Sequence, residues 1–278
     1  MLLEILEHTL LDSLKVLPFL FLTYLALEYL EEKLEEKSVN LVHKSRKWGP
    51  VIGSALGIIP QCGFSAAASS LYSGGVISMG TLIAVFLSTS DEMLPIFVSQ
   101  QVEPLLILKV LGFKFLAALA AGLVIDLFLR SRPRTIHEMC EQEGCHCEEG
   151  IWKSAIRHTL KIYLFLLAVS FVVSLAVHLV GEENLALFIL NKPVLGELLS
   201  GILGLIPNCA ASVVITQLYL QGGMSAGAML SGLLVGAGVG VLTLFRTNRN
   251  WKENLTILAL LYGCGVVLGF IGGLLPIF

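Results

Sequence analysis

The chain has 278 residues, of which 55% are hydrophobic and 14% are charged, and its formal net charge is -3. Soluble domains carry about 25% charged residues, so this composition excludes an ordinary water-soluble enzyme. The absence of net positive charge argues against a nucleic-acid-binding protein. We therefore expect an all-α polytopic membrane protein, because helices satisfy their own backbone hydrogen bonds in lipid.

Long apolar segments alternate along the chain with short polar stretches. Crossing the hydrocarbon core takes about 20 residues as a helix, and these segments are the clear candidates for membrane-spanning helices. Within the fifth of them, glycines recur every four residues, a spacing that favours close packing against another helix. The segments are residues 10–30, 78–98, 104–129, 158–180, 225–245 and 254–277, and the glycines are Gly232, Gly236 and Gly240.

Two further apolar stretches, 49–73 and 196–222, are each interrupted near the middle by a proline, a cysteine and small polar residues. The sequence GIIPQCGFSAAASSLYSGG (57–75) aligns without gaps with GLIPNCAASVVITQLYLQG (204–222), at an offset of 147 residues. Glycine and serine recur by chance in any membrane chain, but proline, cysteine and tyrosine in one register indicate an internal duplication. The identical pairs include Pro60/Pro207, Cys62/Cys209, Ser65/Ser212, Tyr72/Tyr219 and Gly75/Gly222.

The same offset relates the flanking segments, so we divide the chain into two membrane repeats, 1–131 and 148–278, joined by a polar linker at 132–147. The basic residues decide the relative orientation of the repeats, because cytoplasmic loops are enriched in lysine and arginine. The loop 34–48 carries four basic residues, while 181–195, the equivalent loop of the second repeat, carries one.

At the next pair of loops the bias is reversed, because 98–106 carries no basic residue and 245–253 carries three. Equivalent loops therefore lie on opposite faces of the membrane, and the repeat is expected to be inverted. The expected localisation is the cell (inner) membrane, as a multi-pass protein with the linker in the cytoplasm and both termini outside.

The inverted arrangement requires each interrupted stretch to enter the membrane and return on the same side. We expect a re-entrant hairpin of two helices of about eleven residues each, reaching roughly 16 Å, so that the hairpin tips meet near the membrane midplane. Broken helices that line a midplane site between inverted repeats are typical of secondary transporters. Each half then contains five segments.

The tip motifs GIIPQCGFS and GLIPNCA, the duplication and the hydrophilic Cys/His linker resemble the ten-helix heavy-metal exporters of the ArsP-like group. The resemblance extends over nearly the whole chain. It implies export of arsenic compounds or other metals, and some relatives carry the label of manganese transporters.

The two tips are the expected substrate site. The prolines end the first arm of each hairpin, and the second arm begins near a serine with unpaired N–H groups and a positive dipole end. The cysteine sulfurs would select soft ions such as copper(I), zinc or arsenite-type metalloids, and the alternative is that these cysteines only pack as small buried hydrophobes. The expected substrate-binding residues are Pro60, Gln61, Cys62, Gly63, Ser65, Pro207, Asn208, Cys209 and Ser212.

Charged side chains inside the expected spanning segments are candidates for ion coupling, because such groups are costly in lipid. Asp91 and Glu92 lie in segment 78–98, and Lys114 lies in segment 104–129, with Asp91 and Lys114 about 10–12 Å deep. They could form a pair, or Asp91 could carry protons for antiport. In the alternative interpretation, Asp91 and Glu92 mark a break near Pro95 and face water.

The linker HEMCEQEGCHCEEG is rich in cysteine and histidine, a composition typical of metal binding. His137, Cys140, Cys145, His146 and Cys147 are therefore expected to capture a soft metal ion as a sensor or delivery site. The alternative is a solvated loop with incidental reduced thiols. The sequence contains no nucleophile–base pair and no nucleotide motif, so we expect neither an enzyme nor a required cofactor.

The function that these features predict is secondary export of a heavy-metal or metalloid ion by alternating access. A transporter of a small oxyanion or organic anion, and a membrane metal sensor that acts through the linker, remain as alternatives. The expected partners are a small inorganic ion and the lipid bilayer, with no nucleic acid, and a homodimer is left open.

Overall fold

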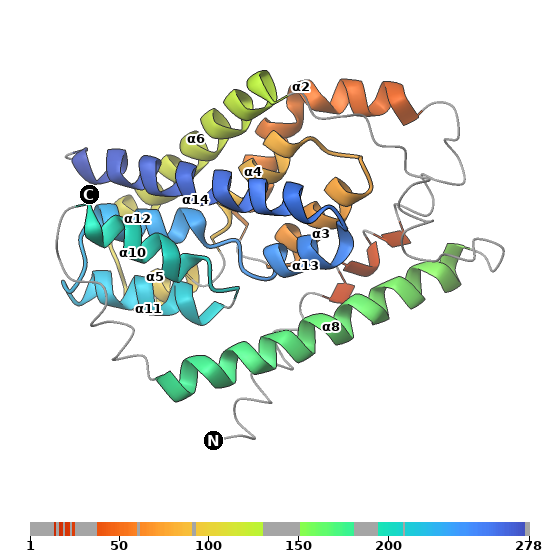
Figure 1. Cartoon of the computed structure of the whole chain (residues 1–278). Helices are drawn as coiled ribbons and strands as arrows, with labels where there is room; N and C mark the ends of the chain where they lie inside the picture. The colour runs from red at the N-terminus through yellow and green to blue at the C-terminus, as the bar shows by residue number, and fades with distance from the viewer. Residues whose placement is uncertain are drawn as a thin grey trace.

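The structure is a computed structural model that describes residues 38–59, 62–90, 93–129, 151–180, 194–207 and 209–275, together with isolated positions between 14 and 25. The described residues are helical throughout and include no strand (Figure 1), which confirms the expected all-α fold. The first half contains α2 (Ser38–Gly57), α3 (Cys62–Ser73), α4 (Met79–Ser88), α5 (Met93–Ser99) and α6 (Pro104–Phe128). The second half contains α8 (Ile151–Val180), α10 (Leu195–Gly204), α11 (Cys209–Leu220), α12 (Ala226–Val235), α13 (Val239–Thr247) and α14 (Trp251–Leu274).

Helix bounds recur between the halves at the offset seen in the sequence. The bounds of α3 (62–73) and α11 (209–220) differ by 147 at both ends, as do those of α4 (79–88) and α12 (226–235). The turns that precede α4 and α12 share their chemistry. Gly75 and Gly222 have φ of 73° and 74°, a left-handed conformation that favours glycine. Ser78 and Ser225 then cap the two helices by accepting a backbone N–H three residues later.

Four stretches of the described chain are long and apolar enough to cross a membrane: Met79–Ser99, Pro104–Phe128, Ala226–Thr247 and Trp251–Leu274. The helix is interrupted within the first and third of these stretches. The first is divided into α4 and α5, and the third into α12 and α13.

Local chemistry explains both interruptions. At the first break, the hydroxyls of Ser88, Thr89 and Ser90 all donate to nearby backbone carbonyls and compete with helix propagation. At the second, Gly238 has φ of 52°, which a continuing right-handed helix does not allow.

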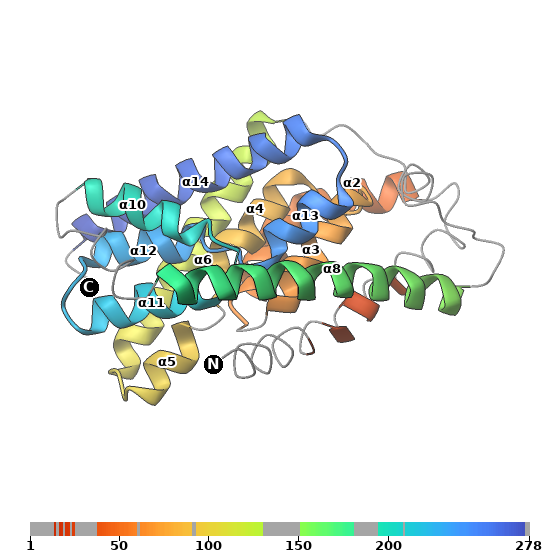
Figure 2. The ribbon, with the colours of Figure 1, turned by 60° about the horizontal axis from the view of Figure 1, so that its bottom comes forward.

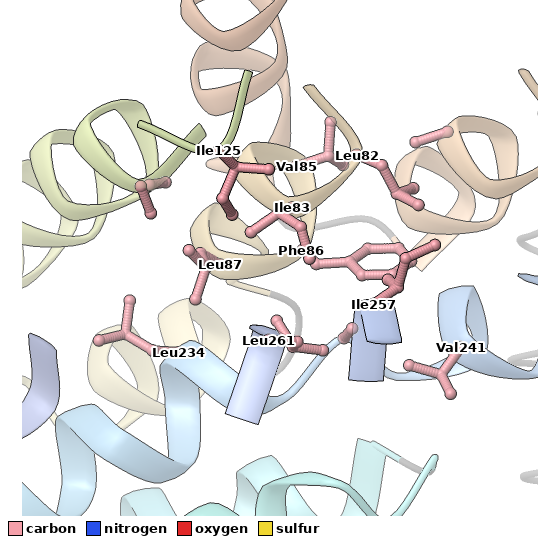
Figure 3. Packing of buried hydrophobic residues seen from close by; sticks show 14 of the residues in the cluster. Leu82, Ile83, Val85, Phe86, Leu87, Ile125, Leu234, Val241, Ile257 and Leu261 are labelled. Atoms are coloured by element: carbon pink, nitrogen blue, oxygen red, sulfur yellow. The ribbon is translucent and has the colours of Figure 1, made fainter. Parts of the chain in front are cut away.

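The core is built from both halves. A cluster of buried apolar side chains joins α4 and α6 to α12, α13 and α14, with Phe86 and Leu87 of α4 and Leu261 of α14 fully buried (Figure 3). By contrast, Leu127 of α6 is 78% exposed and Leu274 of α14 is 69% exposed. Apolar side chains on the outer faces of the longest apolar helices are what contact with lipid requires.

The segments α4–α5 and α12–α13 run in opposite directions in the two views. Figures 1 and 2 show that the chain passes from α4 to α5 toward the end where α12 begins, whereas α12 and α13 run away from that end. In both views α10 and α11 have their outer ends at this same end of the molecule, and the turn that joins them lies toward the middle. Each half also packs on the other, because α3 contacts α13 and α11 contacts α5.

Candidate functional site

The two helix breaks occur at equivalent positions in the two halves. The first follows Ser88 at the end of α4, and the second follows Val235 at the end of α12, 147 residues later. A helix end leaves backbone carbonyls without intrahelical partners. Inside a membrane such backbone is tolerated only where protein or a polar group satisfies it. The breaks therefore identify the part of this fold that is specialised for polar chemistry.

Lys114 forms hydrogen bonds with the backbone at both helix breaks. It lies on α6 and is fully buried. Its Nζ donates hydrogen bonds to the carbonyl oxygen of Thr89, at the first break, and to that of Leu233, at a distance of 3.0 Å. Both carbonyls lie at helix C-termini, where the helix dipole favours a positive charge. One buried cation therefore binds backbone from each half.

The hydroxyl groups at the first break leave oxygen lone pairs available in the interior. Ser88, Thr89 and Ser90 are all buried, with exposed fractions of 0%, 4% and 2%. Their hydroxyls donate to backbone carbonyls at 2.8–3.0 Å. Because each hydrogen is used in this way, the hydroxyl oxygens can act only as acceptors or as ligands toward any further group.

Of the predicted tip residues, the two serines lie beside the second break. Ser65, in the first turn of α3, is fully buried, and its Cβ would lie 2.7 Å from a Cβ placed on Gly240. Ser212 lies in the first turn of α11, and its Oγ is 3.6 Å from a Cβ placed on Gly236. The structure thus brings the starts of α3 and α11, which come from different halves, to one short segment of backbone.

Direct hydrogen bonds hold α3 in this position. The Ser69 hydroxyl donates to the Gly240 carbonyl at 2.7 Å, and it also contacts the Ser65 carbonyl at 2.9 Å. The absence of a side chain on Gly240 allows this approach, because a Cβ there would also come within 2.8 Å of the Phe86 ring. The glycine spacing noted in the sequence therefore does serve close packing, although the helix does not continue through it.

The remaining predicted tip residues are described only in part. Gly63 is buried and Pro207 is half-buried, directly before the start of α11. Cys62 and Cys209 are the first residues of α3 and α11. Their side chains lie outside the described part of the structure, as do the tip residues Pro60, Gln61 and Asn208 in full.

The other predicted sites fall mainly on residues that the structure does not describe. Asp91 and Glu92 occupy the undescribed positions between α4 and α5. The predicted linker ligands His137, Cys140, Cys145, His146 and Cys147 also lie outside the described residues. Within the described ranges, no three His, Cys, Asp or Glu side chains gather in a way that could hold a metal ion.

A break beside Asp91 was predicted from the sequence only as an alternative, and sequence reasoning missed the second break and the contacts of Lys114 with backbone at both breaks. The signal for the second break was present, because Gly-Ala-Gly at 236–238 combines two flexible residues within three. Because Gly232, Gly236 and Gly240 were interpreted as helix-packing residues, no break was predicted there. The signal for the first break was the run of hydroxyl residues before Asp91.

One protein family matches the chain by its sequence profile. The family is described as "Putative, 10TM heavy-metal exporter", and the match extends over residues 2–182, which is more than half of the chain. No curated protein and no solved structure matches the chain.

Proposed function

The chain belongs to this family of ten-segment heavy-metal exporters, and from that premise we propose that it is a secondary transporter that exports a heavy-metal or metalloid ion by alternating access. The main support for the proposal is that helix starts from both halves lie next to the second break. The starts of α3 and α11 both reach Gly236–Gly240, and Lys114 connects the same region to the first break. Discontinuous helices from two halves that meet around buried polar groups are the usual construction of a transporter site.

We interpret the fold as an inverted repeat with two re-entrant hairpins. The recurrence of helix bounds at 147 residues and the opposite directions of α4–α5 and α12–α13 support this interpretation. So does the reversal of the chain between α10 and α11. The hairpin α2–α3 would then enter from the cytoplasmic face of the cell membrane and α10–α11 from the outer face, with both termini outside and the linker inside.

The substrate would bind between the two tips. Cys62 and Cys209 begin α3 and α11, three residues before Ser65 and Ser212. Residues three apart share a face of a helix, so in this proposal their sulfurs bind a soft ion near the second break. Asp91 and Glu92, with Lys114, would couple transport to an ion gradient, and the linker would deliver metal from the cytoplasm.

A second substrate class has its own support. Lys114 is a fully buried cation, and α3 and α11 both direct their N-terminal, positive dipole ends toward the second break. Together these features favour a small oxyanion or organic anion. Under this alternative the tip cysteines only pack, and helix ends and serines bind the substrate.

Flux into vesicles that contain the purified full chain tests the proposal. Arsenite, copper(I), zinc and manganese are supplied in turn, and empty vesicles give the background. We expect Cys62→Ser and Cys209→Ser each to lower flux of the transported soft ion at least tenfold, which is about 1.4 kcal/mol. Cys264→Ser is the matched control, because Cys264 lies half-buried on α14 away from either tip motif.

Competition separates the two substrate classes. If phosphate or a carboxylate inhibits flux and arsenite does not, and both tip variants transport normally, the anion alternative replaces the metal. If no ion of either class moves, the transporter proposal fails.

A further inference from the structure

Each half places a carboxyl group from a neighbouring helix beside the start of a broken helix, but the two carboxyls come from different helices. At α4 the group is Asp126, on α6. Its Oδ1 accepts the backbone N–H of Gly80 at 2.9 Å, and its Oδ2 accepts the hydroxyl of Ser78 at 2.5 Å. At α12 the group is Glu197, on α10, whose Oε1 lies 2.7 Å from a Cβ placed on Gly227, the equivalent of Gly80.

The two carboxyls differ in how well they are satisfied. Both oxygens of Asp126 accept hydrogen bonds, so this group acts as an extended cap of α4. Glu197 is 6% exposed, and its Oε2 has no hydrogen-bond partner among the residues that the structure describes. The hydroxyl of Ser200, one turn further along α10, is fully buried and also has no partner within the described ranges.

Both unpartnered groups face α12. A Cβ on Gly227 would meet Glu197 Oε1, and a Cβ on Gly232 would lie 2.3 Å from Ser200 Oγ. An ionised carboxylate that is buried without donors loses several kcal/mol of solvation. A bound proton removes most of that loss, because a neutral carboxyl requires only one acceptor for its hydrogen. The carbonyl of Gly269 also lies beside this position, 3.4 Å from the same Cβ placed on Gly227.

A metal ion fits this position less well than a proton does. Calcium takes six to eight oxygen ligands, and magnesium requires a near-ideal octahedron. α12 has the sequence AGAMLSGLLV and carries no charged side chain. The described surroundings of Glu197 therefore do not supply the ligand set that a multivalent cation requires.

We propose that Glu197 is a proton-binding carboxyl that couples transport to a proton gradient. In each cycle the carboxylate would take one proton from water at the face where α10 begins. It would release that proton to water at the other face after α10 has shifted against α12. This inference rests on the proposed transport function and names its coupling ion, and it assigns Asp126 a structural role as the cap of α4.

The surroundings contain few groups that could titrate in place of Glu197. α10 packs against α12, α14 and α11, and α10 itself carries no other titratable residue. The nearest identified group is Tyr262, whose hydroxyl donates to the Leu198 carbonyl at 3.1 Å. Lys252 and Glu253 lie at the opposite end of α14, about 24 Å along the helix from Gly269. The titratable residues of the three packed helices are Tyr262, Cys264, Lys252 and Glu253 on α14 and Cys209 and Tyr219 on α11.

Infrared difference spectroscopy of the reconstituted full chain tests proton binding without a substrate. Between acid and alkaline pH, the unmodified protein should show a protonated-carboxyl band that Glu197→Gln removes and Asp126→Asn retains. Glu197→Asp should keep the band at a shifted midpoint, which separates the loss of a carboxyl from a folding defect. A band that is unchanged in Glu197→Gln would overturn the proposal.

Flux measurements test coupling separately, with zinc and arsenite as the probes. We expect Glu197→Gln vesicles to retain exchange of the probe between equal concentrations and to lose at least tenfold of the accumulation driven by a pH gradient. Accumulation equal to that of the unmodified protein would remove Glu197 from coupling. If neither probe moves in any vesicle, the transport function fails for these ions, while the infrared result still decides whether Glu197 binds a proton.

Discussion

The contacts of α3 and α11 show how two halves with the same helix bounds differ in chemistry. α3 is bound to the second half by hydrogen bonds, from Ser69 to the Gly240 carbonyl and between the hydroxyls of Ser73 and Thr247, both at 2.7 Å. The hydroxyl of Tyr72 also donates to the carboxylate of Glu253 on α14.

The equivalent contact of α11 is apolar. Its residues Val214 and Ile215 pack with Met93 and Phe97 of α5 in one buried cluster. Thr216, the equivalent of Ser69, donates only to Ser212 within its own helix. Hydrogen bonds require a specific geometry, whereas apolar packing tolerates sliding. The duplication therefore preserves the backbone, and the divergence of a few side chains makes the α3 contact the more specific of the two.

Removal of Lys114 should have the largest effect, because this residue joins the broken helices of both halves. Lys114→Met eliminates two charge-assisted hydrogen bonds and leaves buried carbonyls unsatisfied, so we expect a loss on the order of 3 kcal/mol in stability and no flux above empty vesicles. Lys109→Met, an exposed position on the same helix, is the control. Thermal unfolding in detergent and vesicle flux measure the two effects. Normal flux in Lys114→Met would show that the hydrogen bonds of Lys114 with the two helix breaks have no role in transport.

A side chain at Gly240 should disrupt the hydrogen-bonded contact of α3 next. Gly240→Ala places a Cβ 2.7 Å from Ser65 Cβ and 2.8 Å from the Phe86 ring, so we expect about 1–3 kcal/mol of destabilisation. Gly263→Ala has no neighbour within 4 Å and should stabilise α14 slightly through higher helix propensity. Equal unfolding temperatures of the two variants would contradict the close approach of α3 and α13.

Paired tyrosine variants give the smallest effect and the most direct comparison of the halves. Tyr72→Phe removes a part-buried hydrogen bond to Glu253 that water can partly replace, so we expect about 0.5–1.5 kcal/mol of destabilisation. Tyr219→Phe, at the equivalent position of α11, removes a hydroxyl for which the described residues provide no hydrogen-bond partner, and it should change stability little. Thermal unfolding of the two variants side by side measures the difference. A larger effect at Tyr219 would reverse the assignment of the specific contact.

Much of the helix arrangement could be predicted from the sequence. The repeated Pro-x-Cys motifs predicted a second helix that begins near Ser65 and near Ser212, because proline and small residues end one helix and allow the next to begin. In the structure α3 and α11 begin three residues earlier. Of the expected site residues, Ser65 and Ser212 do meet a common segment, and Lys114 is fully buried. The roles of Asp91, Glu92, the tip cysteines and the linker ligands stay predictions.

The breaks could not be predicted in the same way. Both breaks lie inside stretches whose average hydropathy is that of a spanning helix. Hydropathy therefore does not indicate where the helical conformation is interrupted. The pairing of Glu197 with Gly227 was equally hidden, because the residue equivalent to Glu197 in the first half is Pro50 and the residue equivalent to Asp126 is Gly273. Because α6 supplies the carboxyl in the first half and α10 supplies it in the second, the two acidic residues do not align when the halves are compared in sequence.

The sequence by itself was sufficient to predict a membrane protein of two related halves, because apolar length and a recurring register are local properties that require no knowledge of the fold. The tertiary structure decided which polar groups meet. Lys114 reaches carbonyls 25 and 119 residues away, and Ser69 reaches one 171 residues away. Buried polar groups in lipid must find partners wherever the packing brings them, and the chemistry of the site therefore depends on helix packing across the two halves.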